Sequence, residues 1–138
     1  MDNTLFLPVT ILALIAILFI LVALNTRKIN YNKKKKLAES LYSYKAGAFS
    51  EEPTVRRDSI IKLDNLLSKS LQLYFNNNLL CGDNLKNAKK IFKKRAYNSL
   101  WEVHKLRNKI VHDDYAITQS EAKHAFDVYK MSILKILQ

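Results

Sequence analysis

Several residue types are scarce in this chain, and their scarcity excludes several classes of structure. It has one cysteine, Cys81, so neither a disulfide framework nor a metal site built from several cysteines is available. Only two glycines and two prolines occur among 138 residues, so long helices meet few interruptions. No segment shows the strict alternation of apolar and polar residues that a half-buried strand needs. These absences predict an all-α protein, and the lone cysteine fits a reducing compartment.

Acidic residues are also scarce relative to basic ones. The chain has 23 Lys and Arg against 12 Asp and Glu, which gives a net charge of +11. An excess of this size suits a phosphate-bearing partner or an anionic membrane surface. An AT-rich coding bias also raises lysine content, so the position of the lysines matters more than their number.

The longest apolar run is Leu5–Leu24, which carries no charge and one polar residue, Thr10. Twenty helical residues span about 30 Å, the thickness of a bilayer core. A cleaved signal peptide is the alternative, but it needs a basic start and a small-residue cleavage site, and this run has neither. We therefore expect residues 1–26 to form a single transmembrane anchor, with the lipid bilayer as a partner.

Basic residues flank only one end of the apolar run. Arg27, Lys28 and Lys33–Lys36 follow it, and no Lys or Arg precedes it. The positive-inside rule then predicts a single-pass protein of the cell membrane with its N-terminus outside and its C-terminal part in the cytoplasm. Contact with anionic headgroups is a second possible role for these lysines. We interpret residues 27–52 as a basic juxtamembrane spacer and residues 53–138 as the folded domain.

Two amphipathic helices are expected in the first half of that domain. The first runs from Thr54 to Phe75 and ends at Asn76–Asn78. One narrow stripe of apolar residues defines its buried face: Ile60, Leu63, Leu67, Leu71 and Tyr74. A loop over Leu79–Asp83 then leads to a second helix over Asn84–Ala96.

The second helix is expected to present a basic face opposite its apolar one. Five lysines form this face: Lys86, Lys89, Lys90, Lys93 and Lys94. Such a face can bind the phosphate backbone of a nucleic acid. It can equally lie against anionic lipid or simply be solvated, which is the commonest role of a charge run.

Two capping boxes predict the starts of the remaining helices. Ser99 is followed three residues later by Glu102, and Thr118 by Glu121. The third helix should therefore run from Ser99 to about His112, and the fourth from Thr118 to the C-terminus. Four amphipathic helices with short connections predict a small antiparallel bundle.

The residues best suited to chemistry lie at the end of the third helix. Arg107, Asn108 and His112 bring a guanidinium, an amide and an imidazole within six residues, in the pattern R-x4-H. A purely structural alternative exists, in which Arg107 pairs with Glu102 or Asp113 and His112 caps the helix. No convincing cluster of metal ligands is visible in the sequence, so we expect no metal and no cofactor.

The segment KLRNKIVHDDY, followed by a helix that opens at Thr118, resembles the HEPN superfamily. The signature of that superfamily is R-x4-6-H, often with a polar residue after the arginine, and the likeness covers about residues 54–138. The resemblance implies a four-helix bundle that often dimerises, with two motifs meeting across one cleft. It also implies metal-independent endoribonuclease activity in many members and a non-catalytic binding role in others.

Carried over to this chain, the resemblance makes Arg107, Asn108 and His112 the candidate catalytic residues. His112 would transfer a proton at the ribose or at the leaving oxygen, and Arg107 would hold the scissile phosphate. His104, one turn before Arg107, is a possible further member. We expect a membrane-anchored HEPN-like domain that binds or cleaves RNA.

The alternative is a non-catalytic module at the membrane that pairs with an unknown protein or with itself. A domain of about 85 residues buries little surface on its own, so a homodimer is expected under either hypothesis.

Overall fold

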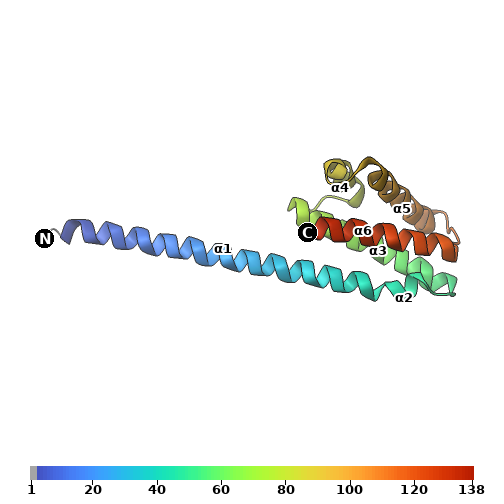
Figure 1. Cartoon of the computed structure of the whole chain (residues 1–138), viewed down its shortest axis with the longest axis horizontal. Helices are drawn as coiled ribbons and strands as arrows, with labels where there is room; N and C mark the ends of the chain where they lie inside the picture. The colour runs from blue at the N-terminus through green and yellow to red at the C-terminus, as the bar shows by residue number, and fades with distance from the viewer. Residues whose placement is uncertain (1–2) are drawn as a thin grey trace. The chain divides into compact units, whose positions relative to one another are not determined.

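The computed structural model describes residues 3–138, except for the side chains of residues 3–5 and 25–29, which include Leu5, Arg27 and Lys28. This described part is all helical, which confirms the predicted class. Its elements are α1 (Asn3–Ser43), α2 (Lys45–Ala48), α3 (Pro53–Phe75), α4 (Cys81–Asn87), a 3-10 helix (Ala88–Lys90), α5 (Lys94–His112) and α6 (Gln119–Leu137) (Figure 1).

The chain divides into two units, Met1–Lys35 and Lys36–Gln138. In the first unit, Phe6–Leu24 is helical, has a mean hydropathy of 3.1 and buries none of its side chains against the rest of the chain. The predicted apolar N-terminal helix is therefore confirmed. Its length and composition suit a membrane span, and they equally suit a signal sequence or a helix covered by another surface.

The second unit is a helical bundle built around α3, α5 and α6. The three long helices alternate in direction along the chain (Figure 1), and α3 packs most extensively on α6. The largest fully buried side chains come from all three helices and include Ile60, Leu67, Leu100, Phe126 and Tyr129. Burying each large apolar side chain contributes about 1.5–3 kcal/mol, so this core dominates the stability of the bundle.

Helix α3 follows the predicted pattern closely. Pro53 occupies its first turn, and Asn76 ends it in the left-handed conformation at φ 51°. The predicted stripe is buried except for Tyr74, which is 53% exposed. The prediction for Tyr74 is therefore wrong, and its ring instead packs edge-on against that of Phe75 at 5.0 Å.

The packed unit begins before Pro53 and includes part of the predicted spacer. Leu41 and Ala48 are fully buried in the same core as α3. Gly47 allows this close packing, because a Cβ at that position would lie 2.0 Å from Oγ of Ser59. Small side chains around Gly47 thus let α2 lie directly against α3.

The predicted second helix over Asn84–Ala96 is wrong in extent. Helix α4 begins at Cys81, inside the predicted loop, and ends at Asn87; the chain then passes through the 3-10 helix and is extended at Lys93. Ala88 is buried and Ile91 packs against the core, and the break in the helix turns both inward. The five lysines therefore lie on α4, on the 3-10 helix and at the start of α5 instead of on one helical face.

Helix α5 starts five residues earlier than Ser99, at Lys94, so the first capping box is not a helix start. In this upstream part, the ring of Tyr97 packs edge-on against that of Trp101, at 6.4 Å between centroids. The predicted end at His112 is confirmed.

The second capping box is confirmed at the start of α6. The backbone N–H of Glu121 donates to the side chain of Thr118, and the Glu121 carboxylate accepts from the backbone N–H of Thr118. Just before it, the buried Arg56 donates from Nε and Nη2 to the Ile117 carbonyl oxygen at 3.3 and 3.1 Å. This contact ties the α5–α6 connection to α3.

Candidate functional site

The carboxylate of Asp64 is the centre of a buried polar cluster inside the bundle. Asp64 lies on α3 and is 2% exposed. Its Oδ1 atom lies 2.8 Å from Nδ1 of His104 and accepts a hydrogen bond from the hydroxyl of Tyr129 at 3.0 Å. With the carboxylate ionised, Nδ1 of His104 carries the proton and donates it. Three helices, α3, α5 and α6, are thereby joined through one acidic side chain.

Arg107 completes this cluster on the side of Oδ2. Its Nε atom lies 3.6 Å from Oδ2 of Asp64, which is close enough for charge attraction and too long for a hydrogen bond. Nε is buried and has no hydrogen-bond partner within the described part of the chain. The Nη1 atom donates to Oδ1 of the neighbouring Asn108 at 3.1 Å. The guanidinium is therefore held on two sides and remains partly exposed.

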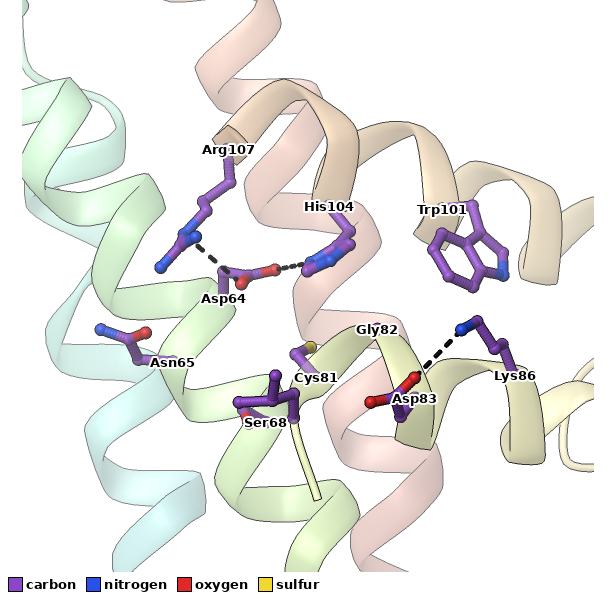
Figure 2. A pocket seen from close by; sticks show the side chains of 11 residues that line it. Asp64, Asn65, Ser68, Cys81, Gly82, Asp83, Lys86, Trp101, His104 and Arg107 are labelled. Atoms are coloured by element: carbon purple, nitrogen blue, oxygen red, sulfur yellow. Dashed lines mark hydrogen bonds and ion pairs between the residues drawn. The ribbon is translucent and has the colours of Figure 1, made fainter. Parts of the chain in front are cut away.

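Helix geometry explains why His104 and Arg107 meet at one place. Residues three apart on a helix lie about 60° apart around its axis, so both side chains project from the same face of α5. Asp64 faces them from the buried side of α3, where it lies four residues after Ile60 and three before Leu67. Figure 2 shows the Arg107 and His104 side chains reaching Asp64 from the same helix.

A cavity of about 510 Å³ opens beside this cluster and exposes part of it to solvent. It lies between α3, α4 and α5 (Figure 2). Polar and charged residues form the majority of the residues that line it: Asp64, Asn65, Ser68, Leu80, Cys81, Gly82, Asp83, Lys86, Trp101, His104 and Arg107. Lys86 and Asp83 form an ion pair at 3.0 Å within this lining. A ligand entering the cavity would meet both signs of charge.

Burial sets the protonation of two groups near the cavity. Burial raises the pKa of the Cys81 thiol, and the nearby charge of Asp64 raises it further, whereas Arg107 opposes the rise. Burial likewise raises the pKa of Tyr129 well above its ordinary value, and the Asp64 carboxylate adds to the effect. Both groups therefore keep their protons at neutral pH, and the Tyr129 hydroxyl can act as a donor.

Three side chains of metal-binding type meet at the cavity. One ligand atom each from Asp64, Cys81 and His104 lies within 4.8 Å of the other two. The three residues come from α3, α4 and α5, so the sequence spacing gives no sign of the cluster. A metal site was not expected from the sequence, and these are the residues of the described chain that could hold one.

The three predicted catalytic residues are only partly brought together. Arg107 and Asn108 are in contact, and Arg107 lines the cavity. His112 is the last residue of α5, is exposed and does not line the cavity. His112 lies five positions after Arg107 on the helix, so the two side chains leave it about 140° apart.

The predicted nucleic-acid-binding lysines are exposed and dispersed. Lys86 lines the cavity, Lys89 and Lys90 belong to the 3-10 helix, and Lys93 and Lys94 stand at the start of α5. Lys94 and Arg95 line a second, more open cavity of about 520 Å³ with Asn98, Ser99 and Glu102. The role of these lysines in binding stays a prediction.

Asp64 and Cys81 are the site residues that the motif did not reveal. One signal in the sequence could have found Asp64, because it is an acid within the apolar stripe that includes Leu63 and Leu67. A charge at such a position is expensive to bury unless it has partners, which predicts a polar cluster inside the bundle. Cys81 carried no comparable signal, since a buried cysteine commonly behaves as a small apolar residue.

Comparison of the chain with family models, with curated proteins and with solved structures gave no match.

Proposed function

We propose that the helical bundle is a HEPN-like domain that binds RNA and cleaves it without a metal ion, held at the cytoplasmic face of a membrane by the apolar N-terminal helix. The observation that carries the proposal is the arrangement of the R-x4-H residues on α5. Arg107 is oriented by Asp64 and Asn108 and remains partly exposed, while His112 stands free at the helix end. A phosphate-binding group and a proton-transfer group thus lie at accessible places on one helix.

The proposed chemistry assigns a separate role to each of these residues. The guanidinium of Arg107 would bind the scissile phosphate with paired hydrogen bonds and stabilise its growing negative charge. The imidazole of His112 would take the proton from the ribose 2′-hydroxyl as its oxygen attacks phosphorus, or protonate the departing 5′-oxygen. Asn108 would support Arg107 through the hydrogen bond already present between them.

The directions of Arg107 and His112 favour a site made by two copies of the bundle. Side chains about 140° apart on one helix do not readily contact the same phosphate. In a twofold dimer, each Arg107 can lie opposite the His112 of the other copy, because such an interface repeats every contact. The small size of the bundle favours the same arrangement. A homodimer is therefore part of the proposal.

A second candidate function is a non-catalytic interaction module at the membrane. The observation that favours it is the position of Arg107, whose Nε is buried 3.6 Å from a buried carboxylate. An arginine in that position can serve mainly to balance the charge of Asp64. The module would then pair with another protein or with itself through surfaces other than the cavity.

The two candidates can be separated with the whole chain purified in detergent. Mixed RNA is incubated with it in EDTA, and cleavage and salt-dependent binding are measured for the wild type, His112→Ala, Arg107→Ala and the control His124→Ala. His124 is an exposed histidine on α6. We expect His112→Ala to lower cleavage by about 10²–10⁴-fold with binding retained, since this is the usual contribution of a general acid or base.

Each other outcome has a defined meaning. Arg107→Ala should weaken both binding and cleavage, and His124→Ala should change neither. Salt-dependent binding without cleavage would leave an RNA-binding module. If the wild type neither cleaves nor binds RNA, the nuclease proposal fails and the interaction module remains. Sedimentation of the same protein at high concentration tests the dimer, which a monomer would exclude.

A further inference from the structure

We infer that Asp64, Cys81 and His104 form a binding site for a zinc-class divalent metal ion, with one coordination position open to the cavity. This inference goes beyond the proposed function, which needs no metal. Its basis is the convergence of three ligand atoms, all within 4.8 Å of one another, from residues 64, 81 and 104. They belong to three different helices, so the tertiary fold assembles the group, and Figure 2 shows the three side chains facing one another.

The types of ligand select the class of ion. A thiolate, an imidazole and a carboxylate together suit zinc, which accepts sulfur, nitrogen and oxygen in tetrahedral sites. Magnesium and calcium are disfavoured, because they require a shell of oxygen atoms. Three protein ligands with a fourth position left for water or substrate are typical of a zinc site that is accessible to small molecules.

The geometry requires only a small adjustment. Ligand atoms around tetrahedral zinc lie roughly 3.3–3.8 Å apart, given metal–ligand distances of about 2.0–2.3 Å. The longest separation among the three ligand atoms would therefore shorten by about 1 Å at most to reach this range. The contact of 2.8 Å between Nδ1 of His104 and Oδ1 of Asp64 would lengthen as the ion replaces the shared proton. Cys81 is the first residue of the short helix α4.

The second nitrogen of His104 also faces the cysteine segment. A Cβ added at Gly82 would lie 3.7 Å from Nε2 of His104, so the backbone next to Cys81 passes beside the imidazole. His104 is only 8% exposed. Its Nδ1 therefore faces the Asp64 carboxylate, and its Nε2 faces the backbone beside Cys81.

The groups around the three ligands would hold them in place. The Tyr129 hydroxyl donates to Oδ1 of Asp64 at 3.0 Å and so orients the carboxylate. Removing a hydrogen bond of this kind to a metal ligand commonly weakens metal binding by about 10–100-fold. The Asp64 carboxylate and the Cys81 thiolate together offset the two charges of the ion, and the thiol proton passes to solvent on binding. The cluster then carries the single positive charge of Arg107, which lies 3.6 Å from Asp64 and favours an anion at the open position.

The cavity supplies the open coordination position. It has a volume of about 510 Å³ and is lined by Asp64, Cys81 and His104 together with polar groups such as Ser68 and Asn65. A water molecule needs only a small fraction of this space and two to four polar partners. An ion held by the three ligands would therefore keep a water molecule that can exchange with a small ligand.

Cobalt titration of the whole chain tests the site directly. The protein is purified in detergent, stripped with EDTA and titrated with Co²⁺, while the thiolate-to-cobalt absorption in the near ultraviolet and the tetrahedral visible bands are recorded. We expect one equivalent to produce both signals and Zn²⁺ to remove them. Cys81→Ser should abolish the near-ultraviolet band, His104→Ala should weaken binding at least tenfold, and Tyr129→Phe should weaken it about 10–100-fold. The control His124→Ala should bind as the wild type does.

A second measurement uses only the wild-type chain and so does not depend on how the variants fold. Cys81 is the one cysteine in the chain, so alkylation can be followed by the mass of the intact protein. We expect Zn²⁺ to slow alkylation at least tenfold and Mg²⁺ to leave it unchanged. Absence of the cobalt bands in the wild type, an unchanged spectrum in Cys81→Ser, or alkylation at the same rate with and without Zn²⁺ would each overturn the inference. No RNA is involved, so this result and the RNA experiment succeed or fail separately.

Discussion

Two histidines on α5 show how differently the middle and the C-terminal end of one helix are used. His104 is 8% exposed, contacts Asp64 through Nδ1 at 2.8 Å and packs edge-on against Trp101 at 5.8 Å between ring centroids. His112 is exposed at the last residue of the helix, and its ring makes no hydrogen bond within the described part of the chain. The buried histidine is held by the fold, whereas the exposed one is free to meet a ligand or a second copy.

The largest effect should come from removing the Asp64 carboxylate, which holds the buried histidine in the middle of α5. Asp64→Ala leaves the donors of His104, Tyr129 and Arg107 without their acceptor inside the bundle. Breaking a buried charge pair usually costs about 3–5 kcal/mol, so we expect a loss of at least about 3 kcal/mol in the free energy of unfolding. Urea unfolding of the whole chain in detergent, followed by circular dichroism, measures this loss.

Asp127→Ala is the matched control for that substitution. Asp127 is exposed on α6, and such surface changes usually alter the unfolding free energy by less than about 0.5 kcal/mol. If the two variants unfold at the same urea concentration, Asp64 is not the centre of the buried polar cluster, and the contrast between the middle and the end of α5 is lost.

The two histidines should also differ in how much each contributes to the free energy of unfolding, and this effect is smaller. His104→Ala removes a hydrogen bond to a charged group and should cost about 2 kcal/mol of stability. His112→Ala should change the unfolding free energy by less than about 0.5 kcal/mol, because the side chain is solvent-exposed. Thermal unfolding of both variants beside the wild type checks the difference. A larger loss in His112→Ala than in His104→Ala would reverse the comparison.

Much of the fold follows from the sequence because local rules control it. The stripe on α3 is set by the helical repeat, its end by Asn76 in the left-handed conformation, and the start of α6 by the Thr118 capping box. The interruption between α4 and α5 could not be predicted from local rules of this kind. Ala88 and Ile91 lie at helical spacing, and only the tertiary core requires the chain to turn there.

The residues of the candidate site differ in the same way: some are close in sequence, and others meet only through packing. Arg107, Asn108 and His112 are close in sequence, so a motif finds them. Asp64 and Cys81 join His104 only after α3, α4 and α5 have packed, because 40 residues separate Asp64 from His104. Contacts of this range depend on which helix faces which, and a single sequence contains that information only indirectly.

The smallest predicted effects concern the start of α6, next to the exposed end of α5. Thr118→Ala removes the side chain that accepts from the backbone N–H of Glu121 and should cost about 1 kcal/mol.

The same capping box makes the stability of the fold depend on pH. Hydrogen bonds, chiefly from the Thr118 backbone N–H and then from the Thr118 and Tyr115 hydroxyls, lower the pKa of Glu121 below its ordinary value of 4.5.

A lowered pKa in the folded state means that the ionised carboxylate favours folding. This contribution is therefore complete above about pH 4.5 and is lost as the pH falls further through the folded-state pKa. Glu121 is close to solvent, so the loss should be a fraction of a kcal/mol. Unfolding of the wild type and Glu121→Gln at pH 7 and at pH 3 checks it, since the variant should lose less stability than the wild type on acidification. An equal loss in the two proteins would show that the Glu121 carboxylate of the capping box does not contribute to the response to acid.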